Sequence, residues 1–62
     1  MIKEELKKVF KDWSINLYIN PNETCSIVIS YFDINTTEEV VFKNYDVAKR
    51  IFENVAKECK ND

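Results

Sequence analysis

Hydrophobic residues near the amino terminus recur with the period of a helix. They stand at offsets of 4, 7, 8 and 11 from the first, which predicts one apolar stripe on a helix over residues 2–13: Ile2, Leu6, Val9, Phe10 and Trp13. The opposite side of this helix would carry lysine and glutamate, with Glu4 and Lys8 at the spacing that favours an ion pair. The pattern therefore predicts an amphipathic helix with one solvated face.

From Ser14 onward the period falls to two. Alternating positions predict three strands, over residues 14–20, 24–32 and 38–43. Pro21 ends the first of them, because proline lacks a backbone N–H. The connections are short, so the strands should form an antiparallel meander. The richer apolar parity is assigned to the core: Ile15, Leu17, Ile19, Cys25, Ile27, Ile29, Val40 and Phe42.

The helical period returns after residue 43. Asn44 or Asp46 can cap a second helix, and Asp46 also complements its dipole. The apolar stripe of this helix comprises Tyr45, Ala48, Ile51, Phe52, Val55, Ala56 and Cys59. The predicted fold class is α+β in one domain over residues 1–62: an αβββα order with a three-stranded antiparallel meander and both helices packed on one face.

The second face of the predicted sheet should be open to solvent. Its residues are mostly polar: Asn16, Tyr18, Ser26, Val28, Ser30, Phe32, Val41 and Lys43. Among them Tyr18, Val28, Phe32 and Val41 could form an apolar row. Such a row is either a binding surface or an ordinary scatter of apolar residues on a solvated sheet.

The composition removes most enzyme classes. The chain has no histidine, which is the commonest general base and metal ligand at neutral pH. It has no glycine, which phosphate-cradling loops and nucleophile elbows require. Cys25 and Cys59 fall at apolar positions and are expected to be small buried hydrophobic residues. We therefore expect a protein that is not an enzyme and that uses no cofactor or metal.

The ends of the chain show no targeting pattern. The first residues carry mixed charges, with no basic region leading into an apolar one, and no apolar run approaches the length of a membrane helix. We expect a cytoplasmic protein with reduced thiols and no membrane association.

Charge is strongly segregated along the sequence. Residues 12–42 hold five carboxylates and no cation, whereas the flanking segments are net positive: Asp12, Glu23, Asp33, Glu38 and Glu39. An anionic surface of this kind favours a protein partner with a basic groove. The αβββα order is also that of double-stranded-RNA-binding domains, but Glu23 and Asp46 would repel phosphate at two contact sites. Direct binding of nucleic acid is therefore not expected, and a degenerate domain of that kind is a less favoured alternative.

Four segments carry a resemblance to a known family. They are KDWSINL at 11–17, SIVISYF at 26–32, DINTTEE at 33–39 and EVVF at 39–42. Together with the expected element order, they resemble the small acidic prophage anti-CRISPR proteins that inhibit Cas9. The resemblance implies that acidic loop residues mimic DNA, at positions Asp33, Asn35, Glu38 and Glu39. The hairpin lacks the family's glycine, and no acidic helix follows the second predicted helix.

These observations favour a non-enzymatic, phage-type inhibitor that binds a basic nucleic-acid-handling protein, in the resemblance a CRISPR effector nuclease in the host cytoplasm. The alternative is a small interaction module or homodimer that associates through the open sheet face or the edge strands. The predicted partner-binding residues are Tyr18, Glu23, Val28, Phe32, Asp33, Asn35, Glu38 and Glu39.

Overall fold

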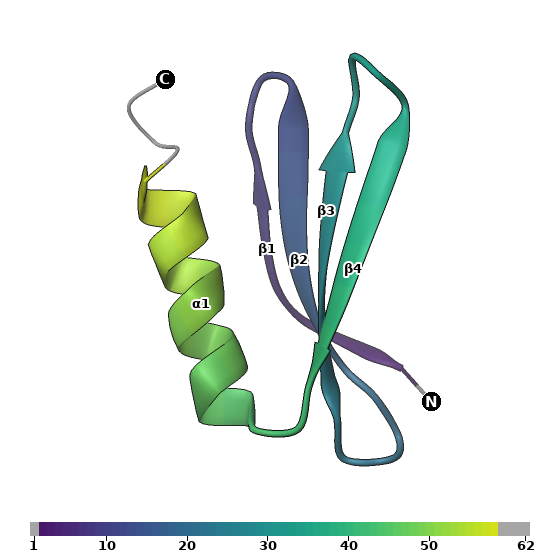
Figure 1. Cartoon of the computed structure of the whole chain (residues 1–62), viewed down its shortest axis with the longest axis vertical. Coiled ribbons are helices and arrows are strands. Elements are labelled where there is room, and N and C mark those ends of the chain that lie inside the picture. The colour runs from purple at the N-terminus through teal and green to yellow at the C-terminus, as the bar shows by residue number, and fades with distance from the viewer. Residues whose placement is uncertain (1, 59–62) are drawn as a thin grey trace.

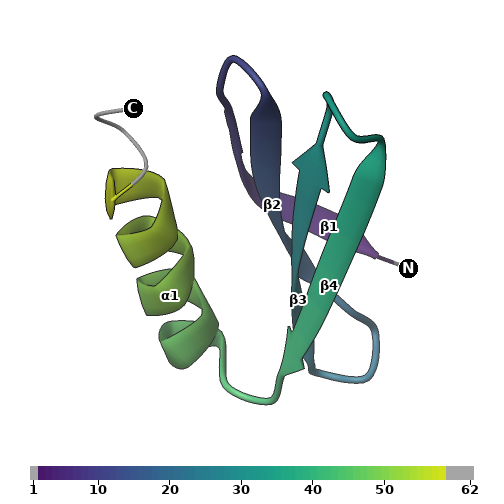
Figure 2. The ribbon, with the colours of Figure 1, turned by 45° about the horizontal axis from the view of Figure 1, so that its top comes forward.

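The computed structural model describes residues 2–58 as one sheet covered by one helix (Figure 1). The four strands lie in sequence order, and each is antiparallel to its neighbour. The elements are β1 Lys3–Val9, β2 Trp13–Ile19, β3 Cys25–Tyr31, β4 Thr36–Phe42 and α1 Tyr45–Glu58. The helix packs on one face against β2, β3 and β4, and the first residues of β1 cross the other face (Figure 2).

The prediction of a helix over residues 2–13 is wrong. Residues Lys3–Val9 form β1, which pairs with β2 so that Leu6 lies opposite Leu17. Helical periodicity is a weak local preference, whereas pairing satisfies the backbone groups along the outer side of β2. The αβββα order with two helices on one face is therefore replaced by a ββββα order with one helix.

Two aromatic residues of the expected helical stripe instead close the β1–β2 hairpin. The rings of Phe10 and Trp13 are stacked, with centroids 4.5 Å apart and 14° between their planes. The Phe10 N–H also donates to the Trp13 carbonyl oxygen at 2.8 Å. Their spacing of three residues suits a helix, but it equally suits the two ends of a tight turn over Lys11 and Asp12.

The antiparallel meander predicted for the other three strands is present as β2, β3 and β4. The third of these begins at Thr36, two residues before the predicted start. The predicted core parity is also correct, since Ile15 and Leu17 are fully buried and Ile27 is nearly so. Val40 belongs to the same face but is 55% exposed. It lies on an edge strand that the single helix reaches less than the two central strands.

Of the two predicted caps, Asn44 caps α1. Its Oδ1 accepts the Val47 N–H at 3.2 Å, while Asp46 lies in the first turn, where its charge complements the helix dipole. The predicted stripe is confirmed where it can be compared, since Ala48, Phe52 and Ala56 are buried. Cys59, the last residue of that stripe, lies outside the described residues.

Phe52 is the largest fully buried side chain of the described structure. It belongs to one cluster with the central strands, formed by Ile15, Leu17, Cys25, Ile27, Ala48 and Phe52. A core this small supplies only about 3–5 kcal/mol of net stability in a domain of this size. Each buried side chain therefore counts for a large share of the total.

We predict that Phe52→Ala leaves the protein largely unfolded, because truncating a buried aromatic residue costs about 3–5 kcal/mol. Ile15→Val should cost about 0.5–1.5 kcal/mol and remain folded. Urea denaturation followed by circular dichroism measures both. Val47→Ala, at an exposed position of the same helix, is the control. A Phe52→Ala protein as stable as that control would contradict the packing described above.

Candidate functional site

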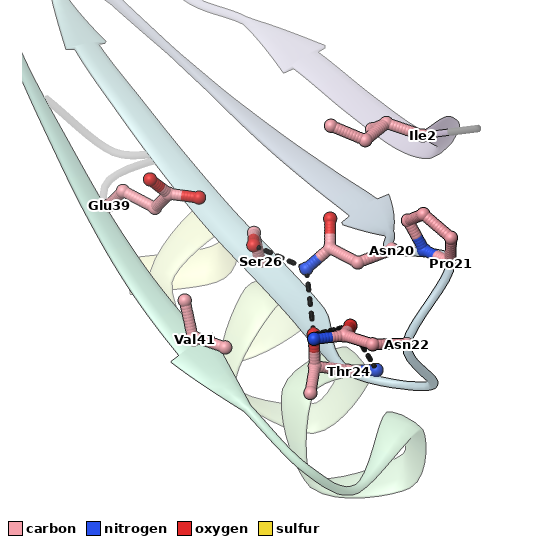
Figure 3. A pocket seen from close by; sticks show the side chains of 8 residues that line it. All are labelled: Ile2, Asn20, Pro21, Asn22, Thr24, Ser26, Glu39 and Val41. Atoms are coloured by element: carbon pink, nitrogen blue, oxygen red, sulfur yellow. Dashed lines mark hydrogen bonds between the residues drawn. The ribbon is translucent and has the colours of Figure 1, made fainter.

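The face of the sheet away from α1 is hollowed because β1 bends across it. The register of β1 shifts between Glu4 and Leu6, which marks a bulge. The first residues of β1 then cross toward the side of β4, as both views show (Figures 1 and 2). The resulting hollow, about 600 Å³, is lined by Ile2, Asn20, Pro21, Asn22, Thr24, Ser26, Glu39 and Val41 (Figure 3).

A hydrogen-bond network fixes one wall of this hollow. Asn20 Nδ2 donates to Thr24 Oγ1 and to Ser26 Oγ, each at 2.9 Å. Asn22 Oδ1 accepts the Thr24 N–H at 3.3 Å and the Thr24 hydroxyl at 2.6 Å. Glu23 has a φ of 66°, in the left-handed region that lets the β2–β3 loop turn tightly. The wall is therefore a structured loop held by its own side chains (Figure 3).

A second hollow of about 250 Å³ continues from the first along the open face. It shares Ile2, Asn20, Ser26 and Glu39 with the first, and it adds Tyr18, Val28 and Thr37. Three predicted site residues, Tyr18, Val28 and Glu39, therefore lie around one concave surface. We call these two adjoining hollows the open-face groove.

The other predicted residues lie elsewhere. Glu38 is on the helix side of β4, where its Oε1 accepts the Tyr31 hydroxyl at 3.2 Å. Phe32, Asp33 and Asn35 lie in the β3–β4 loop. Glu23 lies in the β2–β3 loop, at the opposite end of the sheet (Figure 1). The structure therefore separates the eight residues into the groove, the helix side of β4 and two distant loops.

The two edges of the sheet differ in charge. β4 is an edge strand with every residue exposed except Phe42, and its only charged residues are Glu38 and Glu39. β1, the opposite edge, carries Lys3, Lys7 and Lys8 together with Glu4 and Glu5. The sequence segregation of charge thus becomes an anionic edge and a more cationic edge.

Some residues of the groove are missed by sequence reasoning. The helical period predicts Ile2 on an apolar stripe, whereas in the structure it lines the hollow together with Glu39 and Val41 of β4. The sequence places Asn20 only at the end of a strand, whereas its side chain donates a hydrogen bond to Ser26, which is 2% exposed. The alternation of β3 did assign Ser26 to the open face, but its burial there depends on the bend of β1.

Three further features of the described residues concern metal sites, thiols and membrane spans. Residues 2–58 contain no group of three or more histidine, cysteine or acidic side chains placed to hold a metal ion. Cys25 is a buried free cysteine within the core cluster. Over the same residues, no helix combines the length and apolar character needed to cross a membrane. The site is best described as a shaped and charged surface.

The chain matches no protein-family model, and searches find neither a similar curated protein nor a similar solved structure. The resemblance to anti-CRISPR proteins therefore stays a prediction. The class that the fold and the site define is a small ββββα protein with an open groove and an anionic edge.

We predict that Asn20→Ala destabilises the fold by about 1–3 kcal/mol, because it leaves the buried Ser26 hydroxyl without its donor. Urea denaturation measures the change. Asn54→Ala, at an exposed helix position, should change stability by less than about 0.5 kcal/mol. Equal stabilities of the two variants would show that the network does not hold the β2–β3 loop.

Proposed function

We propose that this chain is a non-enzymatic binding protein that engages a basic protein partner with its β3–β4 hairpin. The observation that carries the proposal is the charge of this hairpin. Asp33, Glu38 and Glu39 are exposed along residues 25–42, which contain no lysine or arginine. The other edge strand, β1, and the described surface of α1 both mix positive and negative residues.

The geometry of β4 suits an extended basic segment. Glu38 and Glu39 project to opposite faces of the strand, because they pair with Ile29 and Val28 respectively. A lysine- or arginine-rich strand added along β4 would meet one carboxylate on each face. The outer backbone groups of an edge strand supply the hydrogen bonds for such addition, and the net negative charge accelerates the encounter.

Proteins that handle nucleic acids are the natural partners for such a surface, since their binding grooves concentrate lysine and arginine. A cytoplasmic inhibitor of such a protein is our proposed role. The narrower expectation of a CRISPR effector nuclease, like the double-stranded-RNA-binding alternative, relied partly on an αβββα order. The observed ββββα order removes that part of its basis.

A second candidate is an interaction module that uses the open-face groove. The observation in its favour is the exposure of apolar side chains at its rim, 62% for Ile2 and 57% for Val41. Phe32 no longer contributes, because it lies in the β3–β4 loop. Binding through this groove would depend on apolar contact and would persist in high salt, whereas binding through the hairpin would not.

We predict that Glu38→Gln/Glu39→Gln and Asp33→Asn each weaken capture of a basic partner by about tenfold or more, since every substitution removes an anion from the binding surface. The immobilised protein is exposed to bacterial lysate at low and at high salt. Bound proteins are identified by mass spectrometry, and their affinities are then measured by titration with the purified partner.

The matched control is Glu5→Gln/Glu53→Gln, which removes the same charge from exposed positions on β1 and α1. Circular dichroism verifies that all variants remain folded. A partner that is basic, is released by salt and is lost only with the hairpin variants supports the proposal. Equal loss in the control, or binding insensitive to salt, contradicts it.

A further inference from the structure

The strand register connects each paired residue of one edge strand, β1, with a residue of the other edge strand, β4. Six rows of directly opposed residues cross all four strands, and each row begins on β1 and ends on β4. Two of them lie before the bulge in β1 and four lie beyond it. Lys7 and Glu39 are the two ends of one row, through Asn16 and Val28. The end pairs of the four rows beyond the bulge are Leu6 with Val40, Lys7 with Glu39, Lys8 with Glu38, and Val9 with Thr37.

These row ends are chemically complementary. Two rows end in a lysine on β1 and a glutamate on β4, and a third ends in two aliphatic residues, Leu6 and Val40. We propose that β1 of a second copy of this chain pairs antiparallel with β4, with Lys7 of the second copy opposite Glu39. The pairing places Lys8 of that copy opposite Glu38.

This register preserves the faces of the sheet. Residues of one row project from the same face, so Lys7 and Glu39 both lie on the open face, and Lys8 and Glu38 both lie on the helix side. Antiparallel rows alternate between hydrogen-bonded and non-hydrogen-bonded pairs. Each row crosses four strands, so its three pairs alternate between the two kinds and begin and end with the same kind. A fourth pair, between β4 and β1 of the second copy, is then of the other kind and continues the alternation in the same register.

Pairings between like edges are disfavoured by the same charges. An antiparallel pairing of β4 with β4, centred between its two charged residues, sets Glu38 of each copy opposite Glu39 of the other. The equivalent pairing of β1 with β1 opposes Lys7 and Lys8. Like charges directly opposite each other destabilise a strand pair, so the charges select the junction between β1 and β4.

The junction is short, which makes its charges decisive. The bulge between Glu4 and Leu6 interrupts β1, so regular pairing extends only over Leu6 to Val9. Such a short edge contact is weak and should respond to ionic strength. The inference does not depend on the proposed function, although the second copy would cover Glu38 and Glu39 and so compete with a basic partner.

The test uses two double variants of the full chain. Lys7→Glu/Lys8→Glu makes both edges anionic, and Glu38→Lys/Glu39→Lys makes both edges cationic. Sedimentation velocity at low salt should show association of the wild type, at least tenfold weaker association of each variant alone, and recovery when the two variants are mixed. The variant with all four substitutions should also associate like the wild type.

The matched control is Lys49→Glu/Arg50→Glu, which changes the charge equally at exposed helix positions and should leave association unchanged. Circular dichroism verifies the folding of each protein. A wild type that stays monomeric at high micromolar concentration, or a mixture of variants that associates no better than its parts, overturns the inference. Asp33 lies outside the paired rows, so Asp33→Asn separates the two proposals: it should weaken partner capture and leave self-association intact.

Discussion

A single described helix packs on a sheet of four strands and is too narrow to bury all of them. Which residues are buried and which are exposed follows from this constraint. Phe52 and its neighbours on α1 bury the central residues Ile15, Leu17 and Ile27. The helix cannot also enclose the edge strands, so Val40 remains exposed although it lies on the helix side. The open face has only the bend of β1 to shelter Ser26 and its neighbours. The surfaces available for binding are therefore those that the core is too small to cover.

The central part of this fold could be predicted from sequence because its local and tertiary preferences agree. In β2 and β3 a period of two places Ile15, Leu17 and Ile27 in one core cluster on the helix side. At Asn44 a strong capping residue precedes an apolar stripe. β1 could not be predicted in the same way. Its bulge interrupts the alternation, and the apolar residues Leu6 and Phe10 stand four apart, which suits a helix equally well. The strand is favoured over the helix because β1 pairs with the backbone groups on the outer side of β2.

The candidate site was predictable in its charge and unpredictable in its shape. The cation-free segment correctly located the anionic strand. Its pairing with β3 places Glu38 and Glu39 on opposite faces. Glu23 and Asp33 lie at opposite ends of the sheet, because they stand in the loops before and after β3. Their distance along the sequence alone does not predict this separation. The groove likewise requires Ile2 to reach the side of β4, and that contact arises from a bulge with no signature in composition.

The charges on the two edge strands disfavour the pairing of an edge with its own copy and favour the pairing of β1 with β4. Charged side chains on edge strands normally protect a sheet against uncontrolled pairing. Here they disfavour the pairing of β1 with a second β1 and of β4 with a second β4. Protection of that sort is complete only when both edges carry the same sign. β1 and β4 carry opposite signs in matching rows, so the feature that prevents one association also specifies the other. A basic partner strand and the lysines of β1 then satisfy the same requirement, which is a cation opposite Glu38 and another opposite Glu39.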